Sequence, residues 1–343
     1  MERSAVYCQR YWRLVCVLVL APIAASQNPE KNQLVGVGAT TPLAVYSKWF
    51  QAFEKARPDL HFSYIPSGSD EGIQLVTSGK ADFGSSDAPL SDNQLAKAGV
   101  LQFAALLGAI VPIYNLPGLA QPLKFSPRAL AGIYLGTITK WNDTAISGPN
   151  PETQLPSGKI AVIHSANGRG STYIWSDYLS RVNTEWKTAY GRGISINWPV
   201  GAQGDGYANI ARMVKETPNS IGYVELAYAV QNRLHYGQVQ NTAGKFINPD
   251  SASLAAAAIA AAKAVPLDLR ASITNPTGEK SYPISSFTWV LISPKLDARK
   301  REAMKDFLRW TLIEGQSYVE PVGFTMLPKP IVDMELKAID GIP

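Results

Sequence analysis

The sequence has few residues of the kinds that build covalent or metal-based sites. Its 343 residues include only two cysteines, Cys8 and Cys16, and three histidines. Both cysteines fall in an N-terminal segment that we expect to be removed, so the remaining chain should have neither a disulfide nor a thiol nucleophile. His61, His164 and His235 are widely spaced, without an acidic or cysteine neighbour at ligand spacing. The sequence therefore predicts no metal site and no cofactor.

Long apolar runs are also missing, because none approaches the ~20 residues that a membrane-spanning helix needs. The apolar run 14–21 is short, follows three arginines and precedes the small residues 24–26. This pattern is typical of a secretory signal. We therefore expect a signal peptide at 1–26, cleaved near Ser26, and a soluble, periplasmic mature protein.

No strong excess of charge is present either. The net charge of the chain is +5, and +2 of it lies in the signal segment. The remaining charges are scattered, which argues against a nucleic-acid partner. With 46% hydrophobic residues, the chain can bury the cores of two domains.

What the sequence does have is four short turns of glycine and small polar residues, each directly before a predicted helix. The first N–H groups of a helix lack partners and carry partial positive charge, so they attract anions. One such turn is usually a simple N-cap. Four turns of related composition predict a site for a small anion. They comprise residues 38–42, 67–72, 85–89 and 167–172.

The first third of the chain alternates strands and helices. Because each predicted helix starts where a strand ends, three of the turns should lie on one edge of a parallel sheet, where α/β sheets bind ligands. The expected strands are 33–37, 60–65 and 81–84, and the expected helices are 43–57, 72–78 and 90–98.

A similar alternation follows with different residues. Together the two parts predict an α/β protein of two lobes, with crossing strands between them and a cleft for a ligand. The strand 282–292 is expected to return to the first sheet, and the alanine-rich segment 251–265 to form a surface helix. The other expected helices are 126–134, 171–182 and 294–310, and the other strands 160–164, 221–224 and 234–239.

Four motifs then identify a resemblance. From about residue 34 to about 318, the chain resembles the periplasmic phosphate-binding protein of bacterial ABC phosphate transporters. The resemblance implies a two-lobed periplasmic-binding-protein fold of type II, with lobe I at 27–106 and 285–343 and lobe II at 107–284. The motifs are residues 36–40, 81–91, 133–136 with Lys140 and Trp141, and 221–225.

The same resemblance implies a monomeric receptor, without enzyme activity, that passes inorganic phosphate to the membrane permease of an ABC importer. It places Asp87 as the acceptor of the proton that phosphate carries. A carboxylate is an acceptor only, so it repels sulfate, which carries no proton at neutral pH. The other expected phosphate-binding residues are Thr40, Thr41, Ser69, Gly170 and Ser171.

The fourth turn departs from the family pattern. The family's arginine and its bracing aspartate are replaced by Ser165 and Asn167, and a new arginine, Arg169, appears nearby. We expect Arg169 to bind the anion through its planar fork of donors. The alternative is that Arg169 points to solvent, or that it pairs with Asp70 or Glu71 across the cleft and so holds the lobes together.

Other interpretations remain open at this point. Asp87 could simply cap a helix that begins at Ala88 and Pro89. The departures could mark a paralogue that binds another oxyanion or ligand. A secreted phosphoryl-transfer or hydrolytic enzyme would need a nucleophile with a base, and the sequence offers only the neighbours His164 and Ser165 for that role.

Overall fold

The computed structural model describes residues 33–116, 118–119, 122–263 and 272–342. These residues belong to a single compact unit. The predicted signal peptide, with both cysteines, lies outside them. No helix in these ranges is long and apolar enough to span a membrane.

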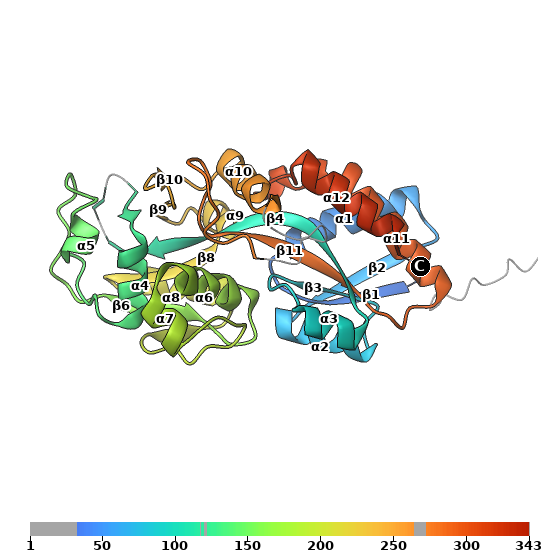
Figure 1. Ribbon diagram of the computed structural model, residues 1–343, viewed down its shortest axis with the longest axis horizontal. Helices are drawn as coiled ribbons and strands as arrows, with labels where there is room; N and C mark the ends of the chain where they lie inside the picture. Colours follow the sequence, from blue (N-terminus) through green and yellow to red (C-terminus); the bar gives the residue numbers. More distant parts are fainter. Residues whose placement is uncertain (1–32, 117, 120–121, 264–271, 343) are drawn as a thin grey trace, which may run out of the picture. The chain divides into compact units, whose positions relative to one another are not determined.

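An eight-stranded sheet runs through this unit in the order β2-β1-β3-β11-β4-β8-β6-β7 (Figure 1). Strands β1, β2 and β3 are parallel, as the sequence predicts, and β6 is parallel to both β7 and β8. Strands β4 and β11 run antiparallel to their neighbours. The strands are β1 (Gln33–Gly38), β2 (His61–Pro66), β3 (Phe83–Ser86), β4 (Leu101–Tyr114), β6 (Ala161–Ser165), β7 (Ala202–Gly204), β8 (Ser220–Glu225) and β11 (Ser285–Ile292).

The long strand β4 belongs to both halves of this sheet. It pairs with β11 up to Ala109 and with β8 from Ile110 onward. Strand β11 pairs with β3 as well, which confirms the predicted return to the first sheet. The predicted lobe boundaries, 106/107 and 284/285, fall within β4 and at the start of β11, and the assignment of residues to lobes remains a prediction.

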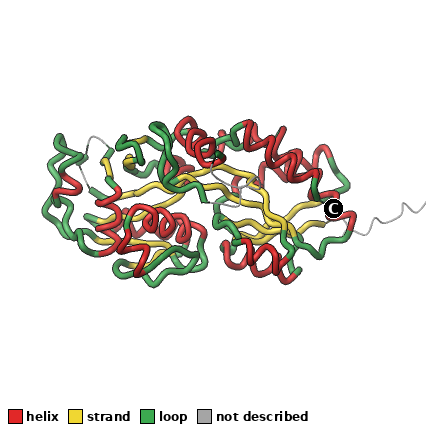
Figure 2. The backbone as a smooth tube through the Cα atoms, viewed as in Figure 1, coloured by secondary structure: helices red, strands yellow, loops and turns green. Residues whose placement is uncertain are grey.

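Helices cover the strands (Figure 2). A small second sheet has the order β10-β9-β5, formed by β5 (Lys124–Phe125), β9 (Gln238–Gln240) and β10 (Phe246–Ile247). The helices are α1 (Leu43–Ala56), α2 (Ser69–Ser78), α3 (Asp92–Ala98), α4 (Pro127–Leu135), α5 (Thr144–Ser147), α6 (Gly170–Val182), α7 (Thr184–Ala189), α8 (Gly206–Glu216), α9 (Leu226–Gln231), α10 (Ser251–Ala262), α11 (Ala298–Ile313) and α12 (Lys329–Asp340).

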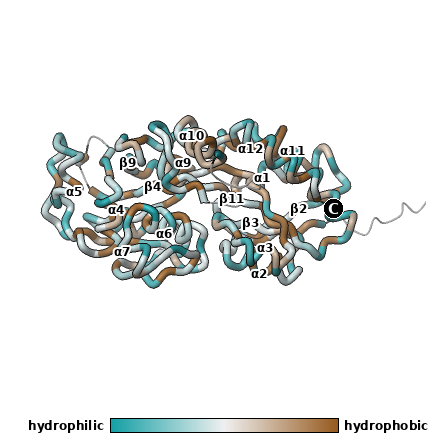
Figure 3. Tube along the Cα trace, viewed as in Figure 1, coloured by the Kyte–Doolittle hydropathy of each residue, from teal (hydrophilic) through white to brown (hydrophobic). Residues whose placement is uncertain are grey.

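Aromatic side chains fix α1 against the first sheet. The buried face of α1 includes Phe50 and Phe53, which contact Phe62 of β2 and Phe307 of α11 at ring-centroid distances of 5.3–5.8 Å. Burying rings of this size contributes much of the packing energy of such a core. The apolar residues of the strands and the polar surface loops can be followed in Figure 3. The turn before α1 is thereby held at the sheet edge.

Several predictions of local structure are wrong. Helix α11 begins at Ala298 rather than at residue 294, because Asp297 caps it. Helix α3 begins at Asp92 rather than Leu90, because Ser91 and Gln94 form a reciprocal capping box. Strand β9 covers only the end of the expected strand 234–239, since the chain there forms a turn after α9. Helix α10 buries one face, including Leu254, so it is not only a surface helix.

Candidate functional site

A small polar cavity lies where the predicted turns meet. The cavity has a volume of only about 10 Å³, so an organic ligand does not fit it in this arrangement. Its lining combines backbone, hydroxyl groups, one carboxylate and one guanidinium. The lining residues are Ala39, Thr40, Gly68, Ser69, Asp87, Ser165, Arg169, Gly170, Ser171, Gly206 and Tyr207.

Helix starts provide much of this lining. Residues Ser69 and Gly170 are the first residues of α2 and α6, and Gly206 is the first residue of α8. Their backbone N–H groups belong to the first helical turn, where no acceptor exists within the helix. The turn before α1 adds Thr40. Four helix starts therefore border one cavity, which favours a bound anion.

The third predicted turn contributes differently. Because α3 is capped by Ser91, Asp87 does not cap a helix, and that alternative for Asp87 is wrong. Instead, the Asp87 side chain is 3% exposed and accepts hydrogen bonds from Thr288 (2.5 Å, Oδ1) and Thr41 (2.7 Å, Oδ2). The carboxylate is thus held in a fixed orientation beside the cavity.

Burial raises the pKa of Asp87 to about 6, although the hydroxyls of Thr288 and Thr41 lower it. Removal from water disfavours the charged form, and donors to the carboxylate favour it. Asp87 is therefore largely ionised at pH 7. In that state it can accept a proton-bearing oxygen of a ligand but has no proton to donate.

Serine hydroxyls line the cavity next to this carboxylate. The Ser69 hydroxyl accepts a hydrogen bond from the Asp87 N–H at 3.2 Å, and the Ser171 hydroxyl donates to that of Ser165 at 2.9 Å. All three serines are buried. Ser165, at the position where the sequence resemblance implies an arginine, therefore places a polar group at the cavity wall.

The guanidinium of Arg169 is engaged by protein groups. Its Nε and Nη2 donate to Asp205 Oδ1 at 3.0 and 2.6 Å, and its Nη1 donates to the carbonyl of Ser67 at 2.6 Å. Asp70 and Glu71 are exposed and do not line the cavity. The predicted pairing of Arg169 with Asp70 or Glu71 is therefore wrong, and its partners are Asp205 and the Ser67 carbonyl.

The cavity brings together six of the seven predicted binding residues. The seventh, Thr41, lies one contact away, bonded to Asp87. Sequence reasoning missed Gly206 and Tyr207 at the start of α8, which line the same cavity. A signal was present, because residues 204–206 form a Gly-Asp-Gly turn of the same type as the other four.

The alternative pair of His164 and Ser165 has no catalytic geometry. The His164 Nδ1 lies 3.1 Å from the backbone carbonyl of Ser165, and its ring stacks on Trp198 at 4.7 Å. The Ser165 hydroxyl instead contacts Ser171. Among the described residues, no group of His, Cys, Asp and Glu side chains is arranged to hold a metal ion.

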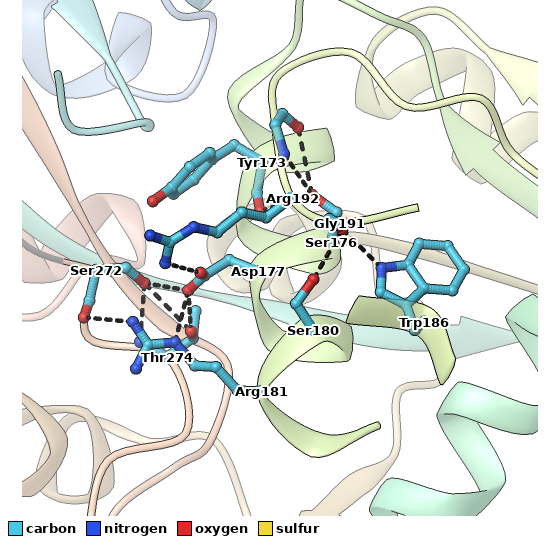
Figure 4. A network of polar contacts seen from close by, with 11 residues as sticks. Tyr173, Ser176, Asp177, Ser180, Arg181, Trp186, Gly191, Arg192, Ser272 and Thr274 are labelled. Atoms are coloured by element: carbon cyan, nitrogen blue, oxygen red, sulfur yellow. Dashed lines mark hydrogen bonds and ion pairs between the residues drawn. The ribbon is translucent and has the colours of Figure 1, made fainter. Parts of the chain in front are cut away.

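A separate polar network braces α6 (Figure 4). The fully buried Asp177 accepts hydrogen bonds from Arg181 at 2.9 Å and Arg192 at 2.7 Å, and from the hydroxyls of Ser272 and Thr274. These contacts tie α6 to the segment after α7, which contains Arg192, and to the segment of Ser272 and Thr274. Asp177, Arg181 and Arg192 line a wider cleft of about 710 Å³.

A second buried carboxylate lies near Asp87. Glu225, at the end of β8, is 4% exposed, and its Oε2 accepts a hydrogen bond from the Tyr228 N–H at 3.1 Å. Its Oε1 lies close to Gly108 of β4. Burial, with a smaller contribution from the charge of Asp87, raises the pKa of Glu225 to about 8. Glu225 is therefore mostly protonated at pH 7.

This shift predicts how stability depends on pH. A carboxyl group whose pKa is raised by folding contributes to the stability of the folded protein. This contribution is complete below the pKa of the unfolded chain, 4.5, and is lost as the pH rises from there through the folded pKa of about 8. We expect Glu225→Gln to be more stable than the wild type at pH 9, by at most about 5 kcal/mol, and to show a flatter profile between pH 5 and 9. Urea unfolding of both proteins across this range measures the difference.

Glu216→Gln is the matched control, because Glu216 is 61% exposed and pairs with Arg212 on the surface of α8. Its free energy of unfolding should follow the wild type within a few tenths of a kcal/mol at each pH. A wild-type profile that rises between pH 5 and 9, or a Glu225→Gln profile parallel to the wild type, would contradict the raised pKa of Glu225.

Comparison with known proteins agrees with this fold, which is that of a periplasmic-binding-protein-like molecule. A family model described as the PBP superfamily domain matches residues 24–314. Within it, the chain belongs to the family of phosphate-binding proteins named PstS. PstS of Xylella fastidiosa strain Temecula1 is 38% identical over 90% of this chain and 85% of the relative. PstS of Pasteurella multocida is 37% identical, over 91% and 93%.

A solved structure supports the fold at lower sequence similarity. It is that of a high affinity periplasmic phosphate-binding protein bound with phosphate, with a TM-score of 0.69, 20% identity, and coverage of 88% of this chain and 92% of that chain. At this level of identity the likeness concerns the fold. It confirms the predicted two-lobed architecture of the periplasmic-binding-protein type.

Proposed function

We propose that this protein is an exported receptor that captures inorganic phosphate between its two lobes and delivers it to an ABC phosphate import permease. The observation that carries the proposal is the small cavity where helix starts meet the buried carboxylate of Asp87. The relatives named phosphate-binding protein support it. The proposed phosphate-binding residues are Thr40, Thr41, Ser69, Asp87, Arg169, Gly170 and Ser171.

The chemistry of the cavity explains a preference for phosphate. Backbone N–H groups and hydroxyls donate to oxygens that lack a proton, while ionised Asp87 accepts from an oxygen that carries one. Sulfate has no such proton at neutral pH, so it leaves the buried carboxylate unpaired. An unpaired buried polar group costs about 1–3 kcal/mol, and more when it is charged.

The proposal includes the location and the partners of the protein. The N-terminal segment 1–26 acts as a signal peptide, and the mature chain works as a periplasmic monomer. Tight closure around a single small ion would give the permease one defined surface to bind. Export and oligomeric state can be checked by N-terminal sequencing of secreted protein and by light scattering.

Titration calorimetry of protein freed of ligand by unfolding and refolding tests the binding function. We expect one phosphate per chain and at least a 100-fold weaker response to sulfate, since a buried unpaired charge costs about 3 kcal/mol or more. Binding of sulfate or molybdate without phosphate binding would refute the assignment of the ligand. Steady turnover of a phosphomonoester by this protein would instead identify an enzyme.

A specific observation favours keeping another oxyanion as the second candidate. All three nitrogens of Arg169 are already engaged with Asp205 and Ser67. Its pairing with Asp205 offsets the charge of Arg169, and one further N–H on each of Nη1 and Nη2 is left for an anion in the cavity. Arsenate and molybdate, included in the same titration, compare ligands of different size and charge.

A further inference from the structure

The lining of the cavity offers little positive charge to a bound anion. Among its described lining residues, Arg169 is the single cation and Asp87 a carboxylate. Arg169 is paired with Asp205 at 2.6 Å, which offsets its charge. Neutral donors must therefore stabilise most of the charge of a bound oxyanion.

Tyr207 is placed to be one of these donors. It is the second residue of α8 and lines the cavity. Its hydroxyl oxygen lies 3.2 Å from Thr41 Oγ1, and its ring packs against that of Tyr228, with the ring centroids 5.9 Å apart. The phenol thus reaches from α8 to the turn before α1.

The direction of these hydrogen bonds follows from the number of protons. Thr41 has one hydroxyl proton and donates it to Asp87 Oδ2 at 2.7 Å. When Asp87 is ionised, the Tyr207 hydroxyl must then donate to Thr41. Burial raises the pKa of Tyr207 well above 10, so this donor keeps its proton at all physiological pH values.

We propose that Tyr207 binds the oxyanion directly, its hydroxyl turning from Thr41 to a ligand oxygen when the cavity is filled. The hydroxyl supplies a neutral donor from α8 to the cavity. The same lining has Ser165 where the sequence resemblance implies an arginine. This inference rests on the proposed function, and it adds α8 to the elements that hold the ligand.

Tyr207→Phe tests this role, because it keeps the ring and removes only the hydroxyl. We expect phosphate binding, measured by calorimetry, to weaken about 10-fold or more, as for a lost hydrogen bond to a charged group. The loss should be the same at pH 8 and pH 9, because Asp87 is ionised and the phenol is protonated at both pH values. The free energy of unfolding without ligand shows whether the variant is folded.

Tyr228→Phe is the matched control: the same atom is removed from the neighbouring ring, and its hydroxyl does not line the cavity. Its affinity should stay within about twofold of the wild type, as for a surface substitution. Equal losses in the two variants would mean that the effect is not specific to the Tyr207 hydroxyl and would overturn the proposal.

A double-mutant cycle with Thr41→Val separates direct binding from bracing of Thr41. Direct binding predicts that Tyr207→Phe weakens phosphate binding in the Thr41→Val background too. If Tyr207 acts only through Thr41, the loss disappears in that background, and the proposal is wrong.

The wild-type titration keeps this test independent of the proposed function. If the wild type binds sulfate or molybdate instead of phosphate, the proposed function fails, and Tyr207→Phe is then measured with the oxyanion that binds. A loss there supports Tyr207 as a ligand. If the wild type binds none of these oxyanions, both proposals are wrong.

Discussion

Gly170→Ala is expected to weaken phosphate binding about 10- to 100-fold, because overpacking a tight contact costs ~1–3 kcal/mol. A Cβ atom at Gly170 would lie 2.5 Å from Asp87 Cβ and 2.7 Å from Ser69 Oγ. These atoms lie on the other side of the cavity, in α2 and at the end of β3. The variant can fold but cannot bring the two sides together, as calorimetry with phosphate should show.

Stability should separate from binding in this variant. Alanine is favoured over glycine in helices, so Gly170→Ala should not lower the free energy of unfolding of the ligand-free protein. Gly206→Ala is the matched control: Gly206 also lines the cavity, but its Cβ would meet nothing within 4 Å. Its positive φ of 78° should cost about 1 kcal/mol of stability while phosphate binding is retained. If Gly170→Ala binds phosphate as tightly as the wild type, the close contact of Gly170 with Asp87 and Ser69 is not needed for binding.

Asp87→Asn is expected to lower the ratio of phosphate to sulfate affinity about 10- to 100-fold, since it removes a penalty of ~1–3 kcal/mol for an unpaired buried acceptor. Asparagine keeps the size of the side chain and one acceptor for Thr41 or Thr288, and its amide can donate to an unprotonated oxygen. Calorimetric titration of each anion at pH 7 gives the ratio.

Asp82→Asn is the control for a lost charge. Asp82 lies just before β3 and pairs with Lys300 at 2.9 Å, away from the cavity lining. The ratio of the two affinities should not change in this variant. If it also stays unchanged in Asp87→Asn, then Asp87 serves only to hold the hydroxyls of Thr41 and Thr288, and the selectivity arises elsewhere.

The sheet edge could be predicted because it follows from local pattern. Strands β1 and β3 and the turns after them are short-range features, and a parallel sheet places the ends of its strands at one edge. The start of α3 could not be placed correctly, because two local signals competed there. The Pro89 signal favoured an early start, and the capping box at Ser91 determines the observed one.

The partners of Arg169 depend on contacts that no local pattern encodes. Asp205 is 36 residues away, and the carbonyl of Ser67 is a backbone group with no sequence signature. Tyr207 was missed for a related reason, because only the folded chain shows that the turn before α8 faces the other turns. The composition of the turns predicted an anion site, and the tertiary structure determines which residues line the cavity.

The contact between Arg169 and the Ser67 carbonyl joins two protein groups and includes no ligand atom. A bond of this kind stabilises the arrangement in which the second and fourth turns meet. For the proposed function this means that the bond favours the binding-competent state, and a state that is already populated reduces the free energy a ligand must supply. Residues outside the proposed ligand contacts, Asp205 among them, would then affect how tightly an ion is held without altering which ion is chosen.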